Sequence, residues 1–119
     1  IALDEELIGI FAVTKKEELL LTVNPQYIIL KPSLIGGIGG SNEWINLSNS
    51  HNVAWWITSA LESNVGLNAI AQFTYDLGVK IPQGLGTGGL FTNNFDSPLE
   101  IKKGELHYNK NKGWNFNLK

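Results

Sequence analysis

Cysteine is absent from the 119-residue sequence, and its absence removes several kinds of chemistry at once. Disulfide bonds, thiol nucleophiles and thiolate metal sites are all excluded. The lack of cysteine also fits a reducing compartment, and we expect a cytoplasmic location. Arginine is absent as well: all nine basic residues are lysine and the formal net charge is −2. Such a charge provides no strong field for phosphate backbones, so nucleic acid is not an expected partner.

Long apolar runs are also missing. No run approaches the roughly 20 apolar residues needed to cross a bilayer, which excludes a membrane span. The length suits one domain, and with 43% hydrophobic and 17% charged residues the composition is that of a soluble globular chain. The chain is therefore short enough to be one domain and long enough to bury an apolar core.

Charge is distributed unevenly along the chain. Residues 1–98 contain nine acidic residues and four lysines, whereas residues 99–119 contain two glutamates and five lysines. This shift predicts a boundary near Pro98 and a tail that packs against something other than the main body. The sequence opens on Ile-Ala-Leu-Asp with neither a methionine nor a positively charged leader, and we interpret this start as a cut end.

Predicted helices and strands alternate over the first 98 residues. A capping-box pattern at Thr14 predicts a helix that ends at Asn24-Pro25, and residues 27–30 form an apolar strand. After a glycine-rich loop, Ser41 is the expected N-cap of a second helix, followed by a strand over residues 53–57. A third helix is predicted from about residue 65 to Gly78, before a strand-like region that precedes Gly84.

The predicted strand ends recur at a nearly constant spacing. They fall at Asp4, Lys31, Thr58 and Gly84, which are 27, 27 and 26 residues apart. Parallel strands joined by helical crossovers bring their carboxyl ends to one edge of a sheet, where sites lie in barrels and open α/β sheets. The tail has a different pattern, since residues 99–102, 105–109 and 114–119 read as antiparallel strands.

Two charged residues at this edge could carry chemistry. Asp4 suits a hard cation such as Mg²⁺, although an acidic cap on the next helix explains it equally well. Lys31 follows a buried strand, where a lysine either acts as an acid or base with a lowered pKa or stays charged and stabilises an enolate. The alternative is a strand-end lysine that reaches water.

The third strand end offers hydroxyl groups. Thr58 and Ser59 precede a predicted helix, and hydroxyls and amides in such a place suit a carboxylate or simply cap the helix. The glycine runs at residues 36–40 and 84–89 could cradle an anion or form tight loops, but neither is followed by Lys-Ser or Lys-Thr, which excludes a P-loop.

Four segments together resemble the C-terminal third of the o-succinylbenzoate synthase family, within the enolase superfamily. They are Ile1-Ala-Leu-Asp-Glu5, Ile29-Leu-Lys-Pro-Ser33, Ile57-Thr-Ser-Ala-Leu-Glu-Ser63 with Gly66-Leu67, and Ile81-Pro-Gln-Gly-Leu85. The resemblance implies an α/β fold: residues 1–98 as about the fifth to eighth strands of a (β/α) barrel. It also implies that residues 99–119 are a β-rich tail that packs on a capping domain absent from this sequence.

The resemblance also implies residue roles. Asp4 resembles the third of three Mg²⁺ carboxylates, and Lys31 resembles the lysine that stabilises the enolate. Thr58, with Ser59 beside it, and Gly84 resemble the positions that meet the substrate's succinyl carboxylate, although the family often has serine where Thr58 stands. The reaction implied is the dehydration of 2-succinyl-6-hydroxy-2,4-cyclohexadiene-1-carboxylate to 2-succinylbenzoate in menaquinone biosynthesis.

Other parts of the family pattern are missing from this sequence. The second-strand lysine that removes the proton and two of the metal carboxylates do not occur, so we expect the 119-residue chain to be inactive alone and to self-associate through uncovered barrel surfaces. Two alternatives stay open: another superfamily enzyme, such as an N-acylamino-acid racemase or a muconate cycloisomerase, and a non-catalytic α/β module that binds a small anion.

Overall fold

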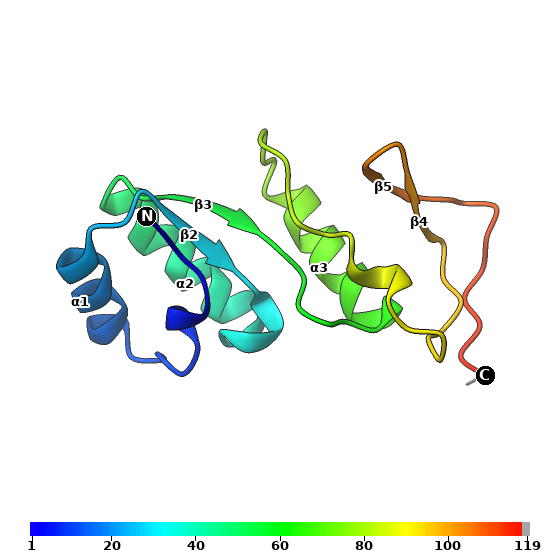
Figure 1. Cartoon of the computed structure of the whole chain (residues 1–119), viewed down its shortest axis with the longest axis horizontal. Coiled ribbons are helices and arrows are strands. Elements are labelled where there is room, and N and C mark those ends of the chain that lie inside the picture. Colours follow the sequence, from blue (N-terminus) through cyan, green and yellow to red (C-terminus); the bar gives the residue numbers. More distant parts are fainter. Residues whose placement is uncertain (118–119) are drawn as a thin grey trace. The chain divides into compact units, whose positions relative to one another are not determined.

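A computed structural model of the chain describes residues 1–117 and divides them into two compact units. The first unit comprises residues 1–58 and 80–84, and the second comprises residues 59–79 and the described residues from 85 onward. The helices and strands are β1 (Ala2–Leu3), α1 (Val13–Val23), β2 (Tyr27–Leu30), α2 (Gly37–Ser50), β3 (Ala54–Ile57), α3 (Asn64–Asp76), β4 (Leu99–Lys102) and β5 (Glu105–Tyr108) (Figure 1). Among residues 1–117, no helix is long and apolar enough to cross a membrane.

The first unit is built on a parallel sheet in the order β1-β2-β3. Leu3 pairs with Ile28, and Leu30 pairs with Ile57. Because β1, β2 and β3 follow one another in the sheet, right-handed crossovers place both α1 and α2 on the same face. Consecutive parallel strands joined by helices are the βα repeat that the spacing predicted, and the α/β fold class is confirmed.

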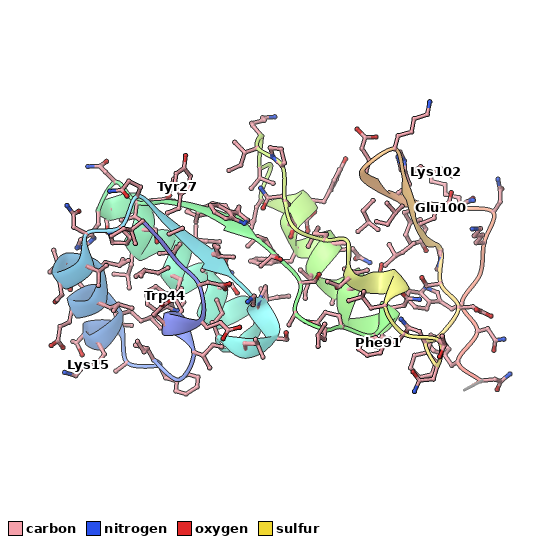
Figure 2. All side chains as sticks on the ribbon, in the orientation of Figure 1. Lys15, Tyr27, Trp44, Phe91, Glu100 and Lys102 are labelled. Atoms are coloured by element: carbon pink, nitrogen blue, oxygen red, sulfur yellow. The ribbon has the colours of Figure 1, made fainter. Side chains whose placement is uncertain are left out.

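The two faces of this sheet differ sharply in exposure. Leu3, Ile28, Leu30 and Ile57 project to the helical face and are buried. The opposite face carries Tyr27, which is 42% exposed and points away from the side that holds Trp44 (Figure 2). A sheet covered on one face only would show the alternation of an antiparallel sheet, yet these strands are apolar on both faces.

Two predicted helix starts are wrong by a few residues. The capping box at Thr14 does not form: α1 begins one residue earlier, and its N-cap Ala12 makes no side-chain hydrogen bond. Ser41 is not an N-cap, because α2 begins at Gly37 and the Ser41 hydroxyl donates a hydrogen bond to the Gly37 carbonyl. The glycines let this first turn pack closely, since a Cβ on Gly40 would lie 2.1 Å from the Ile35 carbonyl oxygen.

The fourth predicted strand is reduced to one bridge. Gly84 forms a parallel bridge with Thr58, and no longer strand occurs in residues 80–84. A side chain holds this segment instead: the Gln83 Oε1 atom accepts a hydrogen bond of 2.7 Å from the Ile57 backbone N–H. Gln83 thus satisfies the edge of β3 where a strand would have done so.

The second unit contains α3 and an antiparallel hairpin. Ser63 is the N-cap of α3, and Gly78 follows the helix with φ of +64°, as the predicted stop requires. Strands β4 and β5 are joined by Lys103-Gly104, which confirms the predicted hairpin. The predicted strand over residues 114–119 is a single bridge between Asp96 and Asn115 within the described part, and residues 118–119 lie outside it. The boundary at residue 98 stays a prediction.

Glu100 anchors the hairpin through charge. Its carboxylate lies 2.6 Å from both the Lys102 and the Lys112 ammonium groups, which lower its pKa to about 2 (Figure 2). The lowered pKa means that this carboxylate stabilises the folded hairpin fully above pH 4.5, and that the stabilisation is lost as the pH falls from 4.5 toward 2.

We predict that the stability difference between wild type and Glu100→Gln shrinks over that interval. Thermal melting at pH 6 and pH 2.5 measures it: wild type should be the more stable at pH 6, and the difference in stability should be much smaller at pH 2.5. A constant difference at both pH values would contradict the assignment.

Candidate functional site

The strand ends of the first unit bring two predicted site residues into direct contact. The Lys31 Nζ atom lies 2.9 Å from Asp4 Oδ1 and 3.0 Å from Asp4 Oδ2. Asp4 follows β1 in the chain and Lys31 follows β2. The predicted juxtaposition of these two residues at one edge of the sheet is therefore confirmed.

The sheet register explains why the contact forms. Leu3 pairs with Ile28, so Asp4 falls beside Ile29, two residues before Lys31 along β2. Residues two apart in a strand project from the same face, so both side chains lie on the face that the helices leave uncovered. The long lysine side chain spans the offset. The strand-end spacing of 27 residues did not reveal this offset, because β1 pairs with β2 at a separation of 25 residues.

Asp4 keeps Lys31 in its charged form. The Lys31 side chain is only 18% exposed, and burial alone would lower its pKa. The hydrogen bond from its ammonium to the Asp4 carboxylate outweighs burial and raises the pKa of Lys31, with a smaller contribution from Glu5, whose Oε1 atom lies 3.6 Å away. Of the two roles open to this lysine, the geometry favours electrostatic stabilisation by a permanent cation over proton abstraction.

Glu5 and Glu6, which follow Asp4 in the sequence, also shape this corner. Glu5 extends the negative charge around Lys31, and Glu6 accepts a hydrogen bond of 3.0 Å from the Asp4 backbone N–H. Hydrogen bonds from its own backbone N–H and from that of Asp4 lower the pKa of Glu6. Glu5 and Glu6 belong to the short 3₁₀ turn Glu5–Leu7, which follows directly after Asp4.

Asp4 offers one oxygen to a cation. The Oδ1 atom is buried and, although it is ion-paired with Lys31, it accepts no hydrogen bond in the described part of the chain. A carboxylate oxygen in this state suits Mg²⁺, which prefers such ligands. Residues 1–117 contain no cluster of three or more histidine, cysteine, aspartate or glutamate side chains able to hold a metal ion. Asp4 therefore fits as one ligand of a larger set.

Thr58 and Gly84 form the next part of the same edge. The Thr58 backbone N–H donates to the Leu30 carbonyl at 2.9 Å, which places Thr58 directly beside Lys31. The Thr58 hydroxyl donates to the Gly84 carbonyl at 2.8 Å, and the Gly84 N–H donates to the Ile57 carbonyl at 2.8 Å. A Cβ on Gly84 would lie 2.6 Å from Thr58 Oγ1, so Thr58 requires glycine at this position.

Ser59 belongs to the second unit, where its side chain is buried. Its Oγ atom lies 2.6 Å from the hydroxyl of Thr87, which in turn donates to the Ala60 carbonyl at 3.0 Å. Of the predicted site residues, Asp4, Lys31, Thr58 and Gly84 thus gather on the first unit, and Ser59 lies in a buried hydroxyl pair of the other.

The structure also shows what the two glycine runs do. Residues 37–40 form the start of α2 rather than a loop, with Gly36 as its N-cap in the left-handed region at φ of +98°. In the second run, Gly88 allows close packing, because a Cβ there would lie 2.7 Å from Leu67. Backbone conformation thus accounts for Gly36, and close packing accounts for Gly40 and Gly88.

Comparison with known proteins gives this site a context. No family model matches the chain. The sequence is 54% identical to o-succinylbenzoate synthase from Desulfotalea psychrophila over 106 residues, which are 89% of this chain and 28% of that protein. It is 34% identical over 71 residues to o-succinylbenzoate synthase from Vibrio cholerae, covering 60% of this chain and 21% of that protein.

The fold agrees with the sequence. The crystal structure of MenC from Desulfotalea psychrophila matches with a TM-score of 0.85 and 54% identity over 89% of this chain and 30% of that one. The predicted resemblance to o-succinylbenzoate synthase is confirmed. The chain spans less than a third of the length of the relatives it matches.

The contact between Lys31 and Asp4 leads to a prediction about the pKa of Lys31. Replacing Asp4 by Asn removes the charge that favours the ammonium, so the pKa of Lys31 should fall. A raised lysine pKa stabilises the folded state at every pH below the pKa of the unfolded chain, which is about 10.5, and this stabilisation is lost as the pH rises through the pKa of the folded state. Asp4→Asn should therefore also reduce the stability of the protein at neutral pH. Carbon-detected NMR titration of the lysine Cε signals measures the shift.

Glu5→Gln is the matched control, because Glu5 contributes less to the pKa of Lys31 than Asp4 does. Its effect should have the same sign and a smaller size. Equal shifts in the two variants, or no shift in Asp4→Asn, would contradict the contact.

Proposed function

We propose that this chain supplies one wall of the active site of an o-succinylbenzoate synthase. The observation that carries the proposal is the contact between Lys31 and Asp4 on the uncovered face of the sheet, next to Thr58, which in turn bridges to Gly84. The reaction would be the syn elimination of water from 2-succinyl-6-hydroxy-2,4-cyclohexadiene-1-carboxylate, which gives 2-succinylbenzoate. The names of the Desulfotalea and Vibrio relatives support this choice of substrate over those of other superfamily enzymes.

Lys31 has an electrostatic role in this proposal. Removing the proton next to the substrate carboxylate leaves negative charge on that carboxylate and its neighbouring carbon. A lysine held charged by Asp4 stabilises this charge as it develops, without changing its own protonation. The base that takes the proton therefore comes from another part of the enzyme, as the family resemblance implies.

Asp4 would hold Mg²⁺ together with carboxylates from outside this chain. When bound, the metal would supply positive charge that makes the substrate proton more acidic. Asp4 also orients the Lys31 ammonium, so the same carboxylate would position both the metal ion and the charged lysine. Both Asp4 oxygens lie within 3.0 Å of the Lys31 ammonium, so a metal held through Oδ1 would leave Oδ2 to accept the lysine hydrogen bond.

Thr58 and Gly84 would form the subsite for the succinyl carboxylate, and the role that the resemblance implies for Ser59 stays a prediction. The Gly84 N–H is already used in the bridge to Ile57, so Gly84 would serve by leaving space rather than by donating. The Thr58 hydroxyl donates to the Gly84 carbonyl and must turn away from it to donate to a carboxylate. Binding at this subsite therefore exchanges one hydrogen bond for a stronger, charge-assisted one.

The chain alone would be inactive under this proposal. Half of the charged groups around the substrate cannot stabilise the reacting carboxylate, and a complete barrel has about 250 residues. The substrate of the complete enzyme would be a small carboxylate. The cytoplasmic location of the protein and the self-association of this chain stay predictions.

A chimera tests the proposed function. In the Desulfotalea enzyme, the segment that this chain matches is replaced by this chain, and dehydration of the cyclohexadiene substrate is followed by ultraviolet absorbance. We expect turnover, and we expect Lys31→Ala to lower kcat by about 10²- to 10³-fold because a fixed positive charge is lost.

Lys80→Ala is the control, since Lys80 is an exposed lysine of the same unit that makes no contact with Asp4. It should leave kcat unchanged. A folded chimera without turnover, or one that Lys31→Ala does not slow, would overturn the proposal.

A further inference from the structure

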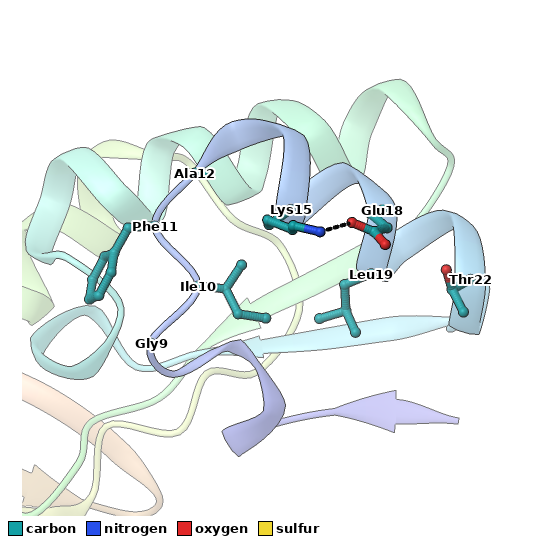
Figure 3. Close-up of a pocket in the computed structure, with 8 residues that line it drawn as sticks. All are labelled: Gly9, Ile10, Phe11, Ala12, Lys15, Glu18, Leu19 and Thr22. Carbon is teal, nitrogen blue, oxygen red and sulfur yellow. Dashed lines mark hydrogen bonds and ion pairs between the residues drawn. The ribbon is translucent and has the colours of Figure 1, made fainter.

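The pocket along α1 is mainly apolar. It measures about 590 Å³, and Ile10 and Leu19 are among the residues that line it (Figure 3). The two charged side chains in its lining, Lys15 and Glu18, are paired with each other at 2.7 Å. The pocket therefore offers a ligand no net charge, whereas several polar groups converge at the carboxyl end of β3.

Ile57 directs both of its backbone groups away from β2. The N–H of the next residue, Thr58, donates to the Leu30 carbonyl of β2 at 2.9 Å. Neighbouring residues of a strand direct their N–H groups to opposite edges, so the Ile57 N–H points to the other edge of β3. There the Ile57 carbonyl accepts from the Gly84 N–H at 2.8 Å, and the Ile57 N–H donates to the Gln83 Oε1 atom at 2.7 Å.

The amide of the Gln83 side chain is held at both of its polar atoms. Its Oε1 atom accepts the Ile57 N–H bond, and its Nε2 atom donates to the Ile81 carbonyl at 2.9 Å. The side chain is half-buried, and each polar atom of the amide already has a backbone partner. Gln83 can therefore influence the site through the backbone that it holds rather than by touching a substrate.

Gln83 fixes the position of Gly84, the next residue in the chain. The Gly84 carbonyl accepts from the Thr58 hydroxyl at 2.8 Å. The two residues are closely packed, because a Cβ on Gly84 would lie 2.6 Å from Thr58 Oγ1. A small displacement of Gly84 would therefore change the space and the hydrogen bonding around the Thr58 hydroxyl.

Substrate binding increases the need for this support. In the proposed function, the Thr58 hydroxyl turns from the Gly84 carbonyl to the succinyl carboxylate. That turn removes one of the hydrogen bonds that hold Gly84 beside β3. The bond between the Ile57 N–H and Gln83 does not involve the Thr58 hydroxyl, so it stays in place during the turn.

We propose that Gln83 is a positioning residue of the succinyl-carboxylate subsite, which keeps Gly84 in place beside Thr58 while the Thr58 hydroxyl turns to the substrate. This role rests on the proposed function. The succinyl carboxylate lies at the far end of a side chain from the carbon that loses its proton, so its contacts are alike in the bound substrate and in the transition state. Loss of Gln83 should therefore weaken substrate binding and leave the chemical step unchanged.

The chimera with the Desulfotalea enzyme tests this role, with 2-succinylbenzoate as a second probe of the subsite. Gln83→Leu removes the amide and keeps a side chain of similar size. We expect KM for the cyclohexadiene substrate and Kd for 2-succinylbenzoate to rise about ten-fold, with kcat within about three-fold of wild type. In NMR spectra with ¹⁵N-labelled isoleucine, the Ile57 amide should exchange with solvent at least about ten-fold faster.

Two variants serve as controls. Gln72→Leu makes the same replacement at an exposed position of α3 in the second unit, and it should leave KM, Kd, kcat and the Ile57 exchange rate unchanged. Gln83→Glu keeps an oxygen that can accept from the Ile57 N–H, so it should restore slow exchange of this amide. Circular dichroism confirms folding, and Gln83→Met replaces Gln83→Leu if the latter does not fold.

Each result decides a different part of the proposal. Unchanged Ile57 exchange in Gln83→Leu would overturn the hydrogen bond on which the role depends. Faster exchange with unchanged KM and Kd, or a fall in kcat alone, would overturn the positioning role. A folded wild-type chimera that binds 2-succinylbenzoate without turnover counts against the proposed function, and the change in Kd then decides the role of Gln83. A chimera with neither turnover nor binding would overturn both.

Discussion

The hydrogen-bond register of three short parallel strands is the constraint on which the rest of the site depends. It places Asp4 beside Ile29 and Thr58 beside Lys31, and so sends their side chains to one face. A slip of one residue between β1 and β2 would turn Asp4 to the opposite face and separate it from Lys31. The buried contacts of Leu3 and Ile28 on the helical face oppose such a slip.

The strands of the sheet are apolar on both faces, as is usual for a parallel sheet that is buried on both sides. In this chain, helices cover only one of the two faces. Tyr27 and Trp56 pack against each other on the open face, with ring centroids 5.4 Å apart. The candidate site and the apolar residues around it share this face, which agrees with a wall that becomes an interior surface when the remaining strands are present.

The sequence predicted the regular parts of the first unit well. The strand at residues 27–30 was placed to the residue, because Pro25 and Pro32 limit it on both sides. The Lys31–Asp4 juxtaposition followed from the repeat, since parallel strands bring their ends together. Those predictions needed only local pattern and general topology.

The errors arose where specific contacts that local patterns do not reveal decide the structure. The start of α2 could not be read from Ser41, because Gly40 packs against the Ile35 carbonyl and α2 already begins at Gly37. The strand before Gly84 is absent because the Gln83 side chain takes the place of a ladder hydrogen bond. The hydroxyl pair between Ser59 and Thr87, which are 28 residues apart, is another contact that no local pattern reveals.

The central claim is that Asp4 and Lys31 are a specific pair across β1 and β2. A charge-swap cycle tests it most directly, with unfolding free energies measured by urea denaturation for Asp4→Lys, Lys31→Asp and the double variant. If the pair is real, each single variant loses stability and the double variant recovers most of the loss, giving a coupling energy well above zero. Additive losses in the double variant would show that the two residues do not meet.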